Sequence, residues 1–193
     1  MPVRLVVLAS GSGSTLAAVL QAAADPAFGA TVVAAGTDRP QCLAMERAAA
    51  AGVPTFAVAL ADHPDRDAWN AALGAELERW RPDLVVLAGF MRVIGADVVN
   101  RFAMVNTHPS LLPAFPGAHA VADALAHGVK LTGVTVHRVD AGLDSGPILA
   151  QVAVPVLDDD TVDRLRARVQ DAEKPLFIET IRQLCHSLEG SAK

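Results

Sequence analysis

The sequence predicts an α/β protein built on a doubly wound, mostly parallel sheet. Two observations lead to this class. Uninterrupted apolar runs, such as residues 5–9 and 84–88, are typical of strands that are buried on both faces of a parallel sheet. Segments of helical periodicity separate these runs, which is the βαβ pattern of such a sheet. Because 52% of the 193 residues are apolar and Tyr is absent, we expect one domain with an aliphatic core.

The first half of the chain alternates between strand-like and helix-like segments. We expect strands at residues 5–9, 31–37, 55–60 and 84–88, and helices at residues 16–24, 42–51 and 67–80. Glycine or proline at residues 52–54 and 81–83 interrupts the pattern, as expected between elements. Trp69 and Trp80 recur at helical spacing with leucines between them, so we expect both in the core. This half is therefore expected to be Rossmann-like.

The second half begins with an apolar run at residues 102–105, which reads as the end of a buried strand. A loop at residues 106–117 follows; its three prolines and one glycine are compatible with neither a helix nor a central strand. Beyond it we expect a helix at residues 120–127, antiparallel strands at 130–140 and 148–156, and a helix at 161–188. Pro175 should kink or divide that helix, and residues 189–193 should form a tail.

Composition and charge narrow the possible partners. The net charge of −5 and the absence of a Lys/Arg cluster disfavour nucleic-acid binding. No apolar run approaches the length of a transmembrane helix, and the N-terminal run is too short for a signal peptide. Cys42 and Cys185 lie far apart in helical contexts, which disfavours a disulfide framework or a cysteine-based zinc site. We expect a cytoplasmic chain with small-molecule substrates and without nucleic-acid or membrane partners.

A glycine- and serine-rich loop at residues 10–15 joins the first expected strand to the first expected helix. This arrangement directs backbone N–H groups and a helix N-terminus at an anion. Leu16 stands where the dinucleotide fingerprint requires its third glycine, and the Gly-Lys pair of a P-loop is absent. The loop therefore predicts a phosphate-monoester or mononucleotide site, with a plain strand-to-helix connector as the alternative. Asp38, after the second expected strand, lies where a nucleotide-binding acid could sit, but we expect a turn residue.

Asn106 and His108 lie where a buried strand gives way to the proline-rich loop. An amide N–H and a protonated imidazole can both donate to an oxygen that gains negative charge, as acyl transfer requires. Asp144 follows a second expected strand, and a carboxylate beside a histidine stabilises the imidazolium. The alternative is that Asn106 caps a turn and that His108 is an ordinary surface or core histidine. The remaining histidines show no metal-ligand spacing, so no metal is expected.

Four motifs occur in the order Ser10-Gly-Ser-Gly-Ser, Leu87-Ala-Gly-Phe-Met-Arg92, Asn106-x-His-Pro-Ser-Leu-Leu-Pro113 and Leu143-Asp144-x-Gly-Pro147. Together they closely resemble the phosphoribosylglycinamide formyltransferase family, the folate-dependent formyltransferases of purine synthesis. The third motif is specific to the formyltransferase superfamily. The resemblance runs from Val3 to the last helix, and it implies one formyltransferase domain over residues 1–193. Within it, residues 1–100 would be a phosphate- or nucleotide-binding half and residues 101–193 a catalytic and folate-binding half.

The resemblance also assigns roles to individual positions. It implies that the catalytic residues are Asn106, His108 and Asp144. It implies a ribonucleotide site at Gly13, Ser14, Thr15 and Glu173. It implies a folate site at Arg66, Met91, Arg92, Val93, Ile94, Asn106 and Asp140. Thr15 stands where family members usually carry Asn, so only the backbone part of that phosphate contact is expected to persist.

The implied reaction moves a formyl group from the co-substrate 10-formyltetrahydrofolate to the amine of N1-(5-phospho-D-ribosyl)glycinamide. The product, formylglycinamide ribonucleotide, belongs to de novo purine (IMP) biosynthesis, and the enzyme is expected to be a monomer or weak homodimer. Two alternatives stay open. A 10-formyltetrahydrofolate hydrolase would use the same three residues with water as the nucleophile, and a nucleotide- or folate-binding module would catalyse nothing.

Overall fold

The computed structural model describes residues 1–191. They form two compact units: one contains Met1–Val105 and the segment from Ile181 onward, and the other contains Asn106–Thr180. Hydrogen bonds connect seven strands in the order β3-β2-β1-β4-β5-β6-β7. The predicted α/β class with a mostly parallel sheet is confirmed. These units describe packing, so the functional halves expected at residues 1–100 and 101–193 stay a prediction.

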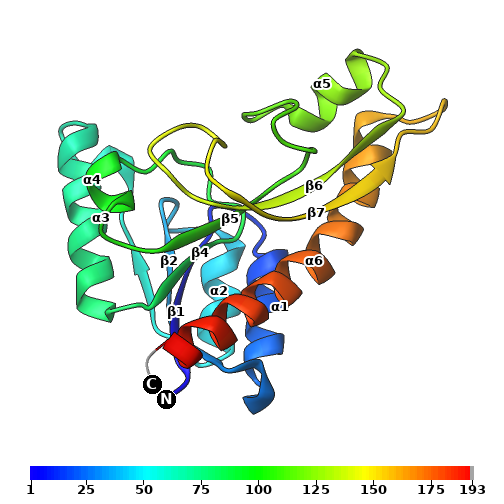
Figure 1. Ribbon diagram of the computed structural model, residues 1–193. Coiled ribbons are helices and arrows are strands. Elements are labelled where there is room, and N and C mark those ends of the chain that lie inside the picture. The colour runs from blue at the N-terminus through cyan, green and yellow to red at the C-terminus, as the bar shows by residue number, and fades with distance from the viewer. Residues whose placement is uncertain (192–193) are drawn as a thin grey trace. The chain divides into compact units, whose positions relative to one another are not determined.

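The first unit is a parallel sheet between two layers of helices. Its strands are β1 (Val3–Leu8), β2 (Ala30–Thr37), β3 (Thr55–Ala57) and β4 (Leu84–Leu87), followed by the start of β5 (Met104–His108). Its helices are α1 (Ser14–Ala23), α2 (Leu43–Ala50), α3 (Arg66–Trp80) and α4 (Ala96–Val99). Strand β1 pairs in parallel with β2 and β4, and β2 pairs with β3. Figure 1 shows α1 and α2 on one face of this sheet and α3 and α4 on the other.

The core of the first unit is as aliphatic as its composition suggests. Leu5 to Leu8 in the central strand are completely buried. Trp69 is completely buried too, and its indole N–H donates to the carbonyl of Val58 at 2.8 Å, which satisfies its polar atom. Both cysteines are free, and burial raises the pKa of the Cys185 thiol to about 12. That thiol is therefore not ionised near neutral pH.

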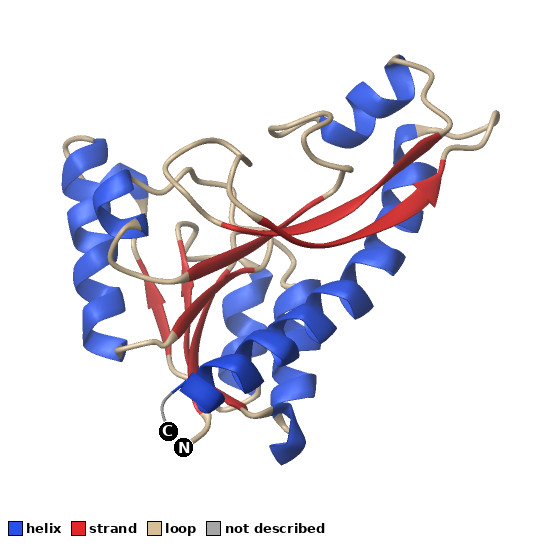
Figure 2. Cartoon of the chain, in the orientation of Figure 1, coloured by secondary structure: helices blue, strands red, loops and turns tan. Residues whose placement is uncertain are grey.

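The second unit is built on two long antiparallel strands, which Figure 2 shows in red. Strands β6 (Leu131–Arg138) and β7 (Ile148–Pro155) pair along their length, as the sequence predicted. Helix α5 (Ala120–Ala126) precedes them, and helix α6 (Val162–Ser191) follows and ends in the first unit. The core cluster of the second unit contains Val121, Val134, Val154, Leu165 and Val169.

Three expectations about these elements were wrong, and one point that the sequence left open was decided by the structure. Strand β3 ends at Ala57, and residues 60–62 form a 3-10 turn instead. Strand β5 continues through His108, an extension that the sequence had left open. Helix α4 was not expected, since four residues are too short to show helical periodicity. Helix α6 is not divided at Pro175, and it includes residues 189–191 of the expected tail; residues 192–193 lie outside the described chain.

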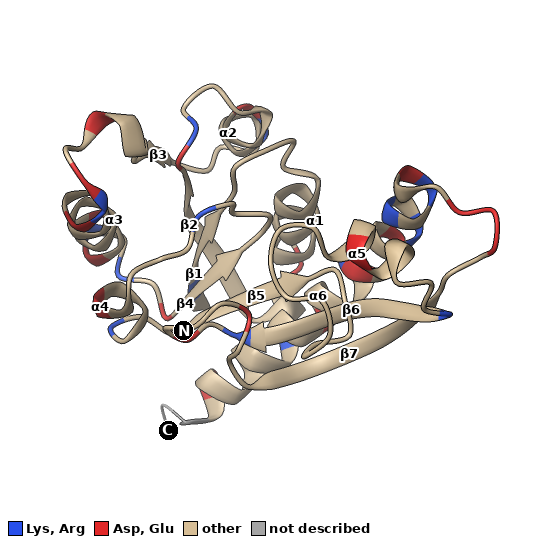
Figure 3. Cartoon of the chain, turned by 90° about the horizontal axis from the view of Figure 1, so that it is seen from above, with Lys and Arg blue, Asp and Glu red and all other residues tan. Residues whose placement is uncertain are grey.

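Charged residues lie mainly on helices and loops, and Figure 3 shows a concentration of them where β7 leads into α6. Asp160 in that connection is buried, with its side chain only 1% exposed. Arg168 donates to its two oxygens at 2.7 and 2.8 Å, and the Leu157 N–H donates at 2.8 Å. The Arg168 hydrogen bonds hold the pKa of Asp160 at about 2. This carboxylate therefore fastens the loop to the helix.

Asp160→Asn should lower the free energy of unfolding at pH 7, and this loss should become progressively smaller as the pH falls. A carboxyl with a depressed folded pKa stabilises the fold fully above its unfolded pKa of about 3.9. That contribution is lost as pH falls through the folded value of about 2. Urea unfolding at pH 7, 4 and 2.5 measures the difference between wild type and variant. Asp163→Asn is the control, because the Asp163 side chain is 91% exposed; a constant difference at all three pH values would contradict this assignment.

Candidate active site

Strand β5 carries Asn106 and His108 at its carboxyl end. Because strand geometry persists to His108, these two side chains lie on the same side of the strand. His108 is only 5% exposed, and its partners all lie within the second unit. The sequence left open whether the strand would extend this far. Because β5 extends to His108, the Asn106 amide and the His108 imidazole lie on the same side of one strand.

Both ring nitrogens of His108 face acceptors. Nε2 lies 2.8 Å from the carbonyl oxygen of Phe115, and Nδ1 lies 3.3 Å from Oδ2 of Asp144. A carbonyl and a carboxylate oxygen can only accept, so each nitrogen needs its own proton to satisfy its partner. His108 is thus held between two acceptor oxygens, one from the backbone and one from a carboxylate.

Asp144 is presented by a tight loop that its glycines permit. Its backbone is left-handed (φ 51°), a conformation that Asp tolerates better than most residues. A Cβ on Gly146 would lie 1.9 Å from the carbonyl oxygen of Arg138, so only glycine fits beside Asp144 in this motif. The N–H of Gly117 donates to Oδ2 of Asp144 at 2.8 Å, and Gly117 is itself left-handed (φ 91°). The carboxylate, 11% exposed, therefore joins two loops.

His137 belongs to this cluster, although the sequence gave no role to it. It lies on β6, 2% exposed, with Nε2 3.2 Å from Nδ2 of Asn106 and 3.7 Å from Oδ1 of Asp144. Its Nδ1 lies 2.9 Å from the carbonyl oxygen of Arg138. A signal was present in the sequence: a histidine at the end of an alternating strand, two residues after Thr135. Pairing between strands was needed to interpret it.

The contacts of His137 determine how the Asn106 amide is turned. The Arg138 carbonyl can only accept, so neutral His137 carries its proton on Nδ1. Nε2 then offers a lone pair, and the Asn106 amide must turn its NH₂ group toward it. One N–H of Asn106 goes to His137, and the other remains as a donor for a ligand. His137 thus orients the amide that the sequence predicted to be catalytic.

One face of β6 supports the whole segment from Asn106 to Leu112. A Cβ on Gly133 would lie 2.6 Å from a methyl carbon of Leu111, so glycine makes room for that side chain. Thr135, completely buried, donates to the Ser110 carbonyl at 2.7 Å and accepts from the Leu112 N–H at 3.0 Å. Gln151 on β7 donates to both Thr135 and the Leu112 carbonyl, each at 2.9 Å. The proline-rich loop therefore begins from a rigid support.

The glycine-serine loop of the first unit has the geometry expected of a strand-to-helix turn. Gly13 is left-handed (φ 72°), and a Cβ on it would lie 2.6 Å from Cα of Ala44. Glycine is therefore required here both by conformation and by close packing. Helix α1 begins at Ser14, so Ser14 and Thr15 occupy its first turn, where backbone N–H groups point away from the helix.

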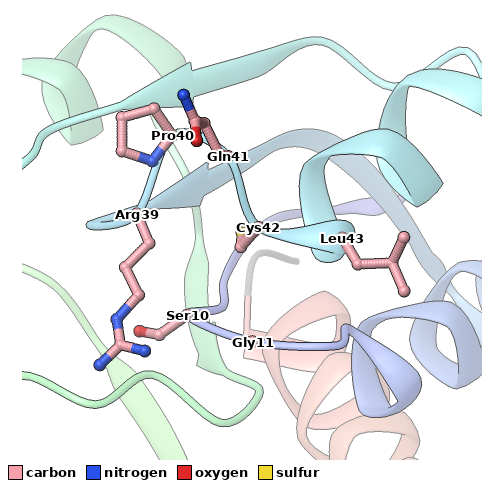
Figure 4. Close-up of a pocket in the computed structure, with 7 residues that line it drawn as sticks. All are labelled: Ser10, Gly11, Arg39, Pro40, Gln41, Cys42 and Leu43. Atoms are coloured by element: carbon pink, nitrogen blue, oxygen red, sulfur yellow. The ribbon is translucent and has the colours of Figure 1, made fainter.

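A cavity of about 570 Å³ lies beside this loop. Figure 4 shows its lining residues, Ser10 and Gly11 from the loop and residues 39–43 from the connection between β2 and α2. Arg39 supplies a positive charge, with its side chain 59% exposed. The cavity thus combines backbone of the glycine-serine loop with a cation.

The segment expected to bind folate, Met91 to Ile94, exposes two apolar side chains, and side chains from other elements fix its position. Met91 and Val93 are 66% and 52% exposed, whereas Ile94 is 5% exposed. Arg66 donates to the Val93 carbonyl at 2.5 Å, and Nε of Arg92 donates to Asp38 at 2.7 Å. Both arginines are therefore engaged in holding the segment. In the other unit, Asp140 accepts from the Gly142 N–H and the Ser145 hydroxyl, so it organises its own loop.

The two units divide the predicted site residues between them. The first contains Gly13, Ser14, Thr15, Arg66, Met91, Arg92, Val93 and Ile94. The second contains Asn106, His108, Asp140, Asp144 and Glu173. Glu173 lies within α6, where its side chain is partly buried. The three residues predicted to be catalytic thus lie within one unit, and the roles of all the site residues stay predictions.

Comparison with known proteins decides the family. A family model described as formyl transferase matches residues 3–181. The chain belongs to the formyl transferase family. Membership of the formyl transferase family implies a folate-derived formyl donor. The family predicted from the four sequence motifs is confirmed.

Several formyl transferases are similar over nearly the whole chain. A phosphoribosylglycinamide formyltransferase of Mycobacterium tuberculosis (strain CDC 1551 / Oshkosh) is 56% identical over 185 residues, which are 95% of this chain and 85% of that protein. The phosphoribosylglycinamide formyltransferase of Escherichia coli (strain K12) is 38% identical over 175 residues, or 90% of this chain and 82% of that protein. The crystal structure of glycinamide ribonucleotide transformylase 1 from Symbiobacterium toebii matches with a TM-score of 0.93 and 43% identity, covering 96% and 89% of the chains.

Two further features concern possible binding partners of this formyl transferase. Among the described residues, no group of three or more His, Cys, Asp or Glu side chains is arranged to hold a metal ion. Within residues 1–191, none of the helices combines the length and apolar character needed to span a bilayer.

Neutral His137 should carry its proton on Nδ1, because Nδ1 faces the Arg138 carbonyl and Nε2 faces the Asn106 amide. Nitrogen-15 NMR of labelled protein distinguishes the two neutral tautomers at a pH above the titration of this ring. Assignment comes from the signal that disappears in His137→Gln. Protonation on Nε2 in the neutral form would contradict the orientation inferred for the Asn106 amide.

Proposed function

We propose that this protein transfers the formyl group of 10-formyltetrahydrofolate to the amine of N1-(5-phospho-D-ribosyl)glycinamide. The product is formylglycinamide ribonucleotide, an intermediate of de novo purine (IMP) biosynthesis. The observation that carries the proposal is the pairing of buried His108 with Asp144, together with Asn106 on the same side of β5, in a member of the formyl transferase family. Relatives that bear the name phosphoribosylglycinamide formyltransferase, including one at 56% identity, support the choice of acceptor.

The first step that the site must assist is attack of the uncharged amine on the formyl carbon. A bond forms between the amine nitrogen and that carbon, and the formyl oxygen gains negative charge. The second N–H of Asn106 and the Nε2–H of His108 are the donors that can stabilise it. One such donor is typically worth about 3–4 kcal/mol in the transition state. The formyl oxygen would replace the Phe115 carbonyl as the acceptor for Nε2–H.

The second step breaks the bond between the formyl carbon and N10 of the folate. N10 leaves more readily when it is protonated, while the attacking nitrogen must lose a proton. We assign this proton transfer to His108, because an imidazole can both donate and accept a proton, and the ring nitrogens of the other imidazole in the site, His137, face Asn106 and the Arg138 carbonyl. Asp144, at 3.3 Å from Nδ1, stabilises the imidazolium in each cycle. The reaction so written balances without a metal ion.

The substrate contacts are proposed residue by residue. Backbone groups of Gly13, Ser14 and Thr15 would hold the phosphate at the first turn of α1, and Glu173 would contact the glycinamide part. Folate would contact Asn106, Asp140 and the segment from Met91 to Ile94, with Arg66 and Arg92 supporting that segment. The exposed side chains of Met91 and Val93 offer the apolar surface that a pterin ring requires.

Other expectations stay predictions. They are a cytoplasmic location, a monomeric or weakly dimeric state, and small molecules as the ligands, with no nucleic-acid or membrane partner. Each is consistent with the proposed reaction, whose two substrates are both small molecules.

The decisive experiment is a spectrophotometric assay of 10-formyltetrahydrofolate deformylation with and without glycinamide ribonucleotide. We expect turnover only when the ribonucleotide is present. Equal turnover in its absence would instead identify a hydrolase that uses water as the nucleophile. Binding of folate without turnover in either case would identify a binding module.

Asp144→Asn should lower kcat by about 10²–10³-fold, as removal of one stabilising group in a buried site commonly does. Asn preserves the shape of Asp and tolerates the left-handed backbone at this position, so the change removes the charge without straining the loop. Asp163→Asn, which makes the same charge change at a 91% exposed side chain, is the matched control. Circular dichroism and thermal unfolding check that both variants fold. Near-normal kcat in Asp144→Asn would rule out the assigned role of this carboxylate.

A further inference from the structure

A buried carboxylate at the end of β2 has no part in the mechanism above. Asp38 was expected to be a turn residue, but its side chain is completely buried. A carboxylate removed from water must be paired and hydrogen-bonded, or it is strongly destabilising. Asp38 lies in the bend after β2, as expected, and the partners that bury its carboxylate come from two other loops of the first unit. Their identity indicates what the carboxylate does.

The partners of Asp38 connect it to the segment expected to bind folate. The Ser10 hydroxyl donates to Oδ1, and Nε of Arg92 donates to Oδ2 at 2.7 Å. Ser10 Oγ in turn accepts the backbone N–H of Met91 at 2.9 Å. Asp38 therefore holds Arg92 directly and Met91 through Ser10. The Nε of Arg39, 4.0 Å from Oδ2, adds a weaker and more exposed positive charge.

The other end of the same segment is held in a similar way. Arg66 donates to the Val93 carbonyl at 2.5 Å, and the Asn70 side chain accepts the Gly95 N–H at 2.8 Å. The backbone from Met91 to Gly95 is thus secured at both ends by side chains from other elements. Between these points, Met91 and Val93 remain 66% and 52% exposed. A fixed backbone that leaves apolar side chains exposed is suited to contact a flat apolar ligand.

We propose that Asp38 is a positioning residue that holds the Met91–Ile94 segment in the geometry that receives the folate co-substrate. This inference rests on the proposed function and deepens it. Arg92 acts mainly as the partner of Asp38, because its Nε is committed to the carboxylate. A buried ion pair of this kind adds little net stability but selects one arrangement of the loops that it joins. The substrate affected is therefore the folate and not the ribonucleotide.

Asp38→Asn tests the proposal because it keeps the size of the side chain and removes its charge. We expect the KM for 10-formyltetrahydrofolate to rise about tenfold, the usual effect of losing a hydrogen bond to a charged group. The KM for the ribonucleotide and kcat should change by less than about threefold, since the change affects ground-state and transition-state binding of folate equally. Asp62→Asn, at an exposed position of the same unit, is the control and should alter neither KM.

A double-mutant cycle separates positioning from direct contact. If Asp38 and Arg92 act as one unit, Asp38→Asn and Arg92→Met should raise the folate KM by similar factors. The double variant should then be about as impaired as either single variant. If Arg92 bound folate independently of Asp38, the two factors would multiply. Multiplying factors would overturn the proposal.

Hydrogen exchange supplies a measurement that does not depend on activity. In Asp38→Asn and in Ser10→Ala, the Met91 amide should exchange about tenfold faster than in wild type, with the thermal midpoint little changed. Faster exchange with an unchanged folate KM would show that Asp38 holds the segment but that this geometry does not matter for folate binding. That result would overturn the proposal. Equal increases in both KM values with a lower midpoint would indicate general destabilisation and would also overturn it. If wild type lacks transferase activity, the proposed function fails; direct titration of these variants with tetrahydrofolate then tests Asp38 separately.

Discussion

The contact between His108 and Asp144 is the constraint on which the loops of the second unit depend. A carboxylate that is 11% exposed needs partners, and Asp144 takes them from His108 and the backbone of Gly117. These contacts tie the loop after β6 to the loop after β5. The same loop has a left-handed backbone at Asp144 and requires glycine at residue 146, where a Cβ would meet the Arg138 carbonyl. The motif around Asp144 therefore has conformational requirements in addition to its proposed catalytic carboxylate.

Strand β6 supplies the rigid support for that contact. Its alternate residues Val134 and Val136 are completely buried, and Val134 belongs to the core cluster with Leu165 of α6. Thr135 and His137 lie on the opposite face, where they bond to Ser110 and Asn106 respectively. Because side chains alternate along β6, one face of the strand packs in the core and the other face supports the candidate site. Any shift of register by one residue would exchange these two sets of side chains.

Buried ion pairs recur where strands end. Asp38 pairs with Arg92 after β2, and Asp160 pairs with Arg168 after β7, and both carboxylates are at most 1% exposed. Each pair joins a loop to a neighbouring element and thereby fixes the geometry of that loop. The two differ in what they hold. Asp160 secures a connection between elements, whereas Asp38 holds a segment whose apolar side chains are exposed.

The α/β class and the formyl transferase family could be predicted from the amino-acid sequence, which also singled out Asn106, His108 and Asp144 as candidate catalytic residues. Apolar runs, helical spacing and ordered motifs are properties of short stretches, so they can be recognised without knowing what lies beside them. Only the tertiary structure revealed that His137 orients Asn106 and that Asp38 is buried against Ser10 and Arg92. It also decided that β5 extends to His108 and that α6 passes Pro175 undivided. These features depend on residues that are distant along the chain. Hydrogen bonds and ion pairs with those residues offset the free-energy cost of burying a charge and determine how far a strand extends.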